Sequence, residues 1–84
     1  MVSRRRIERD AVVALVAMYR TYRMEGFQSL KSADIADRIG LGSPQQLEQP
    51  VLAFLVERGW ATRLNEDFEL TPLGCRKAEL LLNR

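Results

Sequence analysis

The sequence predicts a small, mainly helical protein of the α+β class, in which helices and one β-hairpin follow the order helix-helix-helix-hairpin-helix. Long segments without glycine or proline carry apolar residues at helical spacing. Two alternating segments enclose the turn-forming residues 65–67, as in a short hairpin. A length of 84 residues with 46% hydrophobic side chains fits one domain, residues 1–84, with one core.

The first helix is predicted over residues 4–23, and its apolar surface is wider than one stripe. A helix of this kind is typically buried on two sides. We therefore expect a second copy of the chain to cover the outer side, together with the last helix. The expected homodimer residues are Val12, Val13, Val16, Tyr19, Leu81 and Leu82. The alternative is that the short chain folds tightly over this surface itself.

The next segment predicts a short connector, or a minimal strand, over residues 27–30, followed by a second helix. Ser32 suits the N-cap of that helix, which is expected to continue to Ile39. Gly40 suits the left-handed position that ends a helix. A tight glycine-containing turn is therefore expected before the third helix, within residues 32–59.

The third helix is predicted to start at Ser43 and Pro44 and to continue to Arg58. Pro50 lies inside it, removes one backbone donor and crowds the carbonyl group of Gln46. We therefore expect a kink or a broken first turn near Pro50.

The hairpin is predicted over residues 60–71, and Trp60 and Phe68 are expected to cover the helices from it. Thr71 and Pro72 repeat the combination of cap and proline that starts a helix. The last helix is accordingly predicted over residues 72–83, with Cys75 packed as a small apolar residue near its start.

Three stretches carry a family resemblance: ADIADRIGL at residues 33–41, LVERGWA at 55–61 and FELTPLG at 68–74. In this order they resemble winged helix-turn-helix regulators of the MarR-like and PadR-like kind. The first resembles the initial helix and turn of the motif, the second the end of a recognition helix, and the third the second wing strand with the helix after it. The resemblance covers about residues 32–74, most of the chain.

The resemblance implies a transcriptional regulator that binds double-stranded DNA, with the helix from Pro44 entering the major groove. The side chains that would reach the bases are Ser43, Gln45, Gln46 and Gln49, and glutamine can pair with adenine through two hydrogen bonds. Arg63 in the wing would contact the minor groove or a phosphate. Lys31 and Ser32 would contact phosphate. Each candidate has a structural alternative. The glutamines could be polar residues on an exposed turn, and Arg63 could pair with a neighbouring carboxylate. Lys31 and Ser32 could simply form the start of an ordinary helix.

The charge distribution adds a basic N-terminus to these candidates. The formal net charge is only +2, but residues 1–23 hold six arginines against two carboxylates, whereas residues 32–70 hold seven carboxylates against three arginines. Arg4, Arg5 and Arg6 are therefore expected to contact the DNA backbone, unless they are simply solvated. The acidic middle of the chain favours the alternative function, a winged-helix module that binds another protein without reading DNA.

The composition argues against catalysis and against a bound cofactor or metal ion. The chain has no histidine and a single cysteine, so the commonest general base, the commonest metal ligand and a thiolate metal cage are missing. No apolar run reaches the length of a membrane span. Glu8, Arg9 and Asp10 interrupt the junction that a signal peptide would need. We expect a cytoplasmic binding protein that does not engage a membrane.

Overall fold

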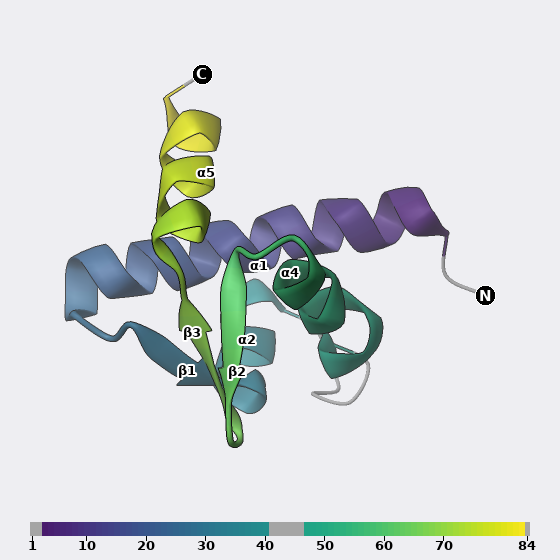
Figure 1. Ribbon diagram of the computed structural model, residues 1–84, viewed down its shortest axis with the longest axis horizontal. Helices are drawn as coiled ribbons and strands as arrows, with labels where there is room; N and C mark the ends of the chain where they lie inside the picture. Colours follow the sequence, from purple (N-terminus) through teal and green to yellow (C-terminus); the bar gives the residue numbers. More distant parts are fainter. Residues whose placement is uncertain (1–2, 41–46, 84) are drawn as a thin grey trace.

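The computed structural model describes residues 3–40 and 47–83. It is mainly helical with a small three-stranded antiparallel sheet, so the predicted α+β class is confirmed. The elements, shown in Figure 1, are α1 (Arg4–Glu25), β1 (Ser29–Lys31), α2 (Ser32–Ile39), η1 (Leu47–Leu52), α4 (Ala53–Glu57), β2 (Ala61–Leu64), β3 (Asp67–Leu70) and α5 (Pro72–Leu82).

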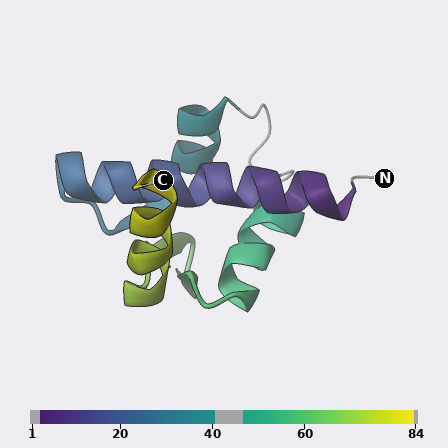
Figure 2. The ribbon, with the colours of Figure 1, turned by 90° about the horizontal axis from the view of Figure 1, so that it is seen from above.

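Helix α1 is the longest element, and the other helices pack around it. It is two residues longer at its C-terminal end than predicted, because the left-handed Gly26, with φ of 81°, ends it. At its start, the Ser3 hydroxyl accepts a hydrogen bond from the Arg6 backbone N–H, at 3.2 Å. Seen from above, α2 lies on one side of α1, whereas α4 and α5 lie on the other (Figure 2). One long helix therefore supports both halves of the fold.

The sheet contains the predicted hairpin and one further strand. Its strand order is β1-β3-β2. Asp67 pairs with both Leu64 and Lys31, so it belongs to β3 and not to the turn in which it was predicted. The left-handed φ of Asn65, 55°, turns the chain between the strands of the hairpin. Strand β1 has only three residues, which is too short for alternation to distinguish it from a connector.

Helix α2 starts one residue earlier than predicted, so the prediction of Ser32 as N-cap was wrong. Lys31 occupies the cap position, with φ of −75° and ψ of 153°, and makes no side-chain cap hydrogen bond. Lys31 is still paired with Asp67 in the sheet, and this pairing holds it in the extended conformation that an N-cap requires. The predicted left-handed end of the helix is confirmed, since Gly40 has φ of 75°.

The third predicted helix is interrupted within its described part. Gln49 has non-helical angles, φ −121° and ψ 115°, inside η1, so the predicted break near Pro50 is confirmed. The ring of a proline disfavours helical angles in the residue before it, which explains the position of the break. The predicted start of this helix, residues 43–46, lies outside the described residues.

A single cluster of buried apolar residues holds the elements together. Leu15 of α1, Ile35 of α2, Leu47 of η1, Leu55 of α4 and Phe68 of β3 are all at most 2% exposed. Trp60 is half-buried against this cluster, with its ring edge-on to Phe54 at 6.1 Å between centroids. Within residues 3–40 and 47–83, no helix combines the length and hydropathy that a membrane crossing requires.

The junction between the hairpin and α5 confirms the predicted cap. The Thr71 hydroxyl accepts a hydrogen bond from the Gly74 N–H at 3.0 Å and donates one to the Gly59 carbonyl oxygen at 2.6 Å. Pro72 occupies the first turn of α5, where the missing N–H is not needed. The same threonine therefore starts α5 and ties it to the end of the preceding helical segment.

Candidate functional site

A depression of about 330 Å³ lies where the start of α2, the start of η1 and the hairpin meet. Its lining contains Lys31, Ser32 and Arg63, three residues expected to contact DNA. The pairing of β1 with β3 holds Lys31 beside the hairpin, and Arg63 reaches the depression from β2. The sheet therefore brings together Lys31 and Arg63, which are separated by 32 positions in the sequence.

Arg63 is held inside this depression by several contacts. Its Nη2 lies 2.8 Å from Oε1 of Glu48, and its Nε donates a hydrogen bond to the Asn65 carbonyl oxygen at 3.4 Å. The guanidinium carbon lies 5.4 Å from the centre of the Phe68 ring. Arg63 is thus paired with a carboxylate, but not with one of its neighbours in the hairpin.

Glu48 is the residue of this site that the sequence did not identify. The expected partners of Arg63 were the carboxylates next to it in the hairpin, whereas Glu48 comes from η1. No local pattern could indicate this contact, because it depends on where the break at Gln49 places the residues before it. Glu66 also lines the depression, so its lining carries carboxylates as well as cations.

The electrostatics of the depression follow from this mixed lining. The first turn of a helix has unpaired N–H groups and a partial positive charge, and Ser32 is the first residue of α2. Lys31 is exposed beside it. An anion that reached this point would find N–H donors and the ammonium group of Lys31. Arg63 would add to them only after leaving Glu48.

The remaining DNA-contact candidates are placed differently. Gln49 is exposed but lies at the break, not on a helical face as predicted. Ser43, Gln45 and Gln46 lie outside the described residues.

The arginines of the N-terminus lie apart from this depression. Arg4 and Arg6 approach Glu8 and Asp10 at 3.6 Å and 3.9 Å, and both arginines are largely exposed. In Figures 1 and 2 the start of α1 lies at one end of the long axis. In Figure 1 the hairpin lies below the middle part of the helix. Arg4, Arg5 and Arg6 are therefore not brought together with Lys31, Ser32 and Arg63.

The residues expected at a homodimer interface fall into two groups. Val12, Val13 and Val16 line a groove between α1 and α2, and Leu82 is 41% exposed. Leu81 instead packs partly against the core. Tyr19 is only 9% exposed, and its hydroxyl donates a hydrogen bond to Oε2 of Glu79 at 3.2 Å. Helix α5 thus already covers Tyr19, which leaves little of it for a second copy.

Tyr19 and Cys75 both have a pKa above the ordinary value for their side chain. Burial raises the pKa of the Tyr19 phenol, and the hydrogen bond and negative charge of Glu79 act in the same direction. Burial also raises the pKa of the Cys75 thiol, again with a contribution from Glu79. A reactive cysteine needs a lowered pKa, so Cys75 is better explained by packing. Among the described residues, no cluster of histidine, cysteine or carboxylate side chains could hold a metal ion.

Comparison of the chain with protein-family models, with curated proteins and with solved structures gives no match.

Proposed function

We propose that this chain is a winged helix-turn-helix domain that binds double-stranded DNA and has no catalytic role. In this proposal α2 and the segment from η1 to α4 are the helix-turn-helix, and β2 with β3 form the wing. The left-handed Gly40 between the helices and the hairpin directly after α4 support this assignment. The observation that carries the proposal is the meeting of Lys31, Ser32 and Arg63 around one depression between helix-turn-helix and wing.

The proposed contacts are of two kinds: contacts to phosphate that orient the protein on DNA, and contacts to bases that recognise the sequence. Lys31 and the first turn of α2 bind a backbone phosphate, which fixes the orientation of the protein without reading sequence. Arg63 exchanges Glu48 for phosphate or the minor groove. Gln49, with Ser43, Gln45 and Gln46, supplies amide and hydroxyl groups for base edges. Phosphate contacts release counterions, so binding must weaken as salt rises.

The test is a fluorescence anisotropy titration of a labelled random duplex pool, at about 50 mM and about 200 mM salt. Replacing Lys31 and Arg63 together by alanine should weaken binding. The slope of log affinity against log salt concentration should also become shallower, by the amount expected for about one lost phosphate contact for each residue. Arg76→Ala is the matched control, because Arg76 is an exposed arginine on α5. Absence of salt-dependent binding by the unmodified protein would refute the proposal.

The second candidate function is a winged-helix module that binds another protein. The observation in its favour is the acidity of the surface around Arg63, where Glu48 and Glu66 line the same depression. If this candidate is correct, the Lys31 and Arg63 substitutions change nothing in the duplex titration, because no duplex binds.

Homodimer formation and a cytoplasmic location stay predictions. If two copies pair by two-fold symmetry, their DNA half-sites should lie about one helical turn, roughly 34 Å, apart.

A further inference from the structure

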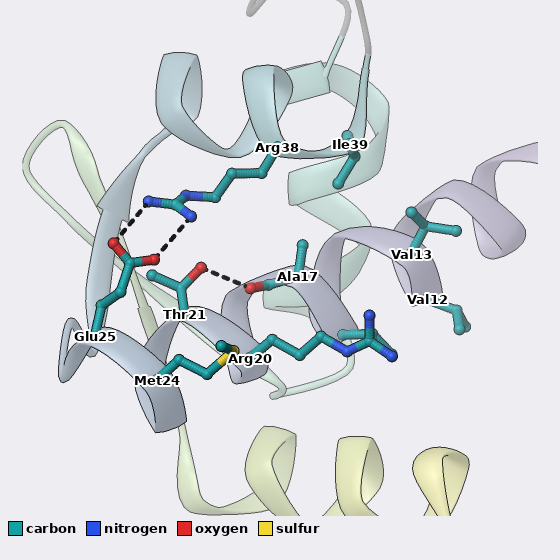
Figure 3. A pocket seen from close by; sticks show the side chains of 10 residues that line it. Val12, Val13, Ala17, Arg20, Thr21, Met24, Glu25, Arg38 and Ile39 are labelled. Carbon is teal, nitrogen blue, oxygen red and sulfur yellow. Dashed lines mark hydrogen bonds and ion pairs between the residues drawn. The ribbon is translucent and has the colours of Figure 1, made fainter.

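Beside α1 lies an apolar groove that the DNA-binding proposal does not use. The groove lies between α1 and α2 and has a volume of about 480 Å³. Val12, Val13, Val16 and Met24 of α1 and Ile39 of α2 supply most of its apolar lining, and Val13 is 46% and Met24 83% exposed. Figure 3 shows Glu25 and Arg38 joined across the two helices at one end of this groove.

The spacing of these residues suits a helix as the occupant. Val12, Val16, Arg20 and Met24 follow one another at intervals of four residues along α1, which places them on one face. From Val12 to Met24 this face is about 18 Å long. Rows of side chains spaced in this way form the grooves into which another helix packs, and an amphipathic helix lays its apolar face into such a groove.

The charged residues at the groove indicate which charge a bound helix should carry. Arg9 and Arg20 stand on the same side of α1 as Val13 and Val16, one before and one after them in the sequence. Within residues 3–40 and 47–83, neither arginine forms an ion pair with a carboxylate. Arg20 lines the groove directly, and in Figure 3 its side chain extends along α1 toward Val12.

The carboxylate that lines the groove is already occupied. Glu25 receives two hydrogen bonds from the Arg38 guanidinium, at 2.9 Å and 3.4 Å. The unpaired charge at the groove is therefore positive. A second copy of this face would bring Arg9 and Arg20 toward arginines of its own kind, and like charges across an interface disfavour pairing.

We infer that the groove between α1 and α2 binds an acidic amphipathic helix of a partner protein. Apolar side chains of that helix fill the space over Val12, Val13 and Val16, and its carboxylates pair with Arg9 and Arg20. The inference is independent of DNA binding, because none of these residues lines the depression that contains Lys31 and Arg63.

The probe is a fluorescein-labelled synthetic peptide of about 18 residues, with leucines on one helical face and glutamates on the other. One control peptide has the same composition in scrambled order, and a second has lysine in place of glutamate. Fluorescence anisotropy with the full chain should show saturable binding of the leucine–glutamate helix only. Binding that is equal for the scrambled peptide, or for the lysine peptide, would overturn the inference.

Two pairs of variants locate the binding on the protein. Val13→Asp and Arg20→Glu should each weaken peptide binding at least about tenfold. Leu64→Asp is the control for the first, since Leu64 is also 46% exposed but lies in the hairpin. Arg76→Glu is the control for the second, because it makes the same charge change on α5. Retained binding in both groove variants would contradict the proposal.

Folding and self-association are checked on the same samples. Circular dichroism tests whether each variant is folded. If Val13→Asp unfolds the chain, Arg20→Glu decides, because Arg20 is exposed. Sedimentation velocity of the unmodified protein tests the other occupant. A dimer that Val13→Asp dissociates would show that a second copy fills the groove, and the inference would be wrong.

Discussion

The contact between Arg63 and Glu48 decides how much of the candidate DNA surface is available to an anion. The pair is short, 2.8 Å, and only partly exposed on the side of Glu48. An arginine that is already paired contributes little attraction to phosphate until its partner is removed. For the proposed DNA binding, the charge beside Arg63 therefore matters more than the net charge of the chain.

Glu48→Gln should accordingly strengthen duplex binding. The substitution removes the carboxylate that Arg63 must leave before it contacts phosphate, so the same contact forms without breaking an ion pair. We expect an affinity gain of about three- to tenfold at low salt, from a titration of the same duplex pool. Glu57→Gln is the control, because Glu57 is exposed on α4 and lines no part of the depression. An unchanged or lower affinity for Glu48→Gln would show that the ion pair does not restrain Arg63.

Tyr19 gives the protein a dependence of stability on alkaline pH. Its pKa in the folded chain lies above the ordinary value of 10.0, because burial and Glu79 disfavour the phenolate. The unfolded chain ionises first as pH rises, so the contribution to stability is complete below about pH 10 and is lost above it. Urea unfolding at pH 8, 10 and 11 should therefore show a smaller alkaline decrease in the free energy of unfolding for Tyr19→Phe than for the unmodified chain. Tyr22→Phe, at an exposed position, should keep the original decrease.

At the residue scale, the sequence named three residues that line the depression but not the contact that restrains Arg63. Lys31, Ser32 and Arg63 could be named from their positions relative to the helix start and the hairpin. The partnership of Arg63 with Glu48 depends on how η1 is placed against β2, which no local pattern encodes. The burial of Tyr19 by α5 was missed for the same reason, because its contact with Glu79 joins positions far apart in the chain.

At the element scale, the start of α5 and the end of the preceding helical segment approach each other closely at Gly74. A Cβ atom at Gly74 would overlap the Trp60 carbonyl oxygen and would lie 3.1 Å from a methyl carbon of Leu70. The carbonyl group cannot move freely, since it accepts a hydrogen bond from the Thr71 N–H at 3.1 Å. Gly74 is thus required because the backbone of Trp60 leaves no space for a Cβ atom. Helix propensity alone would favour alanine at this position.

Gly74→Ala should destabilise the protein although alanine is the better helix former. We expect a loss of about 1–3 kcal/mol in the free energy of unfolding, as for other insertions into a packed site. Urea unfolding followed by circular dichroism measures it. Arg76→Ala, on the exposed side of the same helix, should change the value by less than about 0.5 kcal/mol. Equal stability of Gly74→Ala and the unmodified chain would mean that the junction can separate without cost.

The elements themselves were predictable where a residue imposes its own backbone geometry. The cap at Thr71 and Pro72, the left-handed end at Gly40 and the break before Pro50 all follow from such residues. The sequence left β1 open between a connector and a minimal strand, and it placed the N-cap wrongly at Ser32, because pairing with β3 determines the conformation there. Tertiary contacts that fix three residues of strand leave almost no periodic signal in the sequence.

At the scale of the whole molecule, the two proposed binding sites meet opposite ends of α2. Lys31 and Ser32 stand at its start beside the hairpin, whereas Arg38 and Ile39 stand at its end beside the groove. The helix has eight residues, so the sites are separated by about 12 Å along its axis. They share an element but no residue of their linings.

The two sites should therefore bind their ligands independently. Arg20→Glu should leave duplex affinity within about twofold, and the double alanine variant of Lys31 and Arg63 should leave affinity for the acidic peptide within about twofold. Anisotropy titrations with each probe, at one fixed salt concentration, measure both. A loss of both activities in either variant would place the two ligands on a single surface.

The interruption at Gln49 has a consequence for how this protein can diverge. Leu47 and Leu52 are completely buried on either side of it, whereas Gln49 is exposed and Glu48 half-buried. Exchanges at the two polar positions change the surface while the buried leucines preserve the interior. Descendants of a common ancestor should consequently differ at Glu48 and Gln49 and retain Leu47, Pro50 and Leu52.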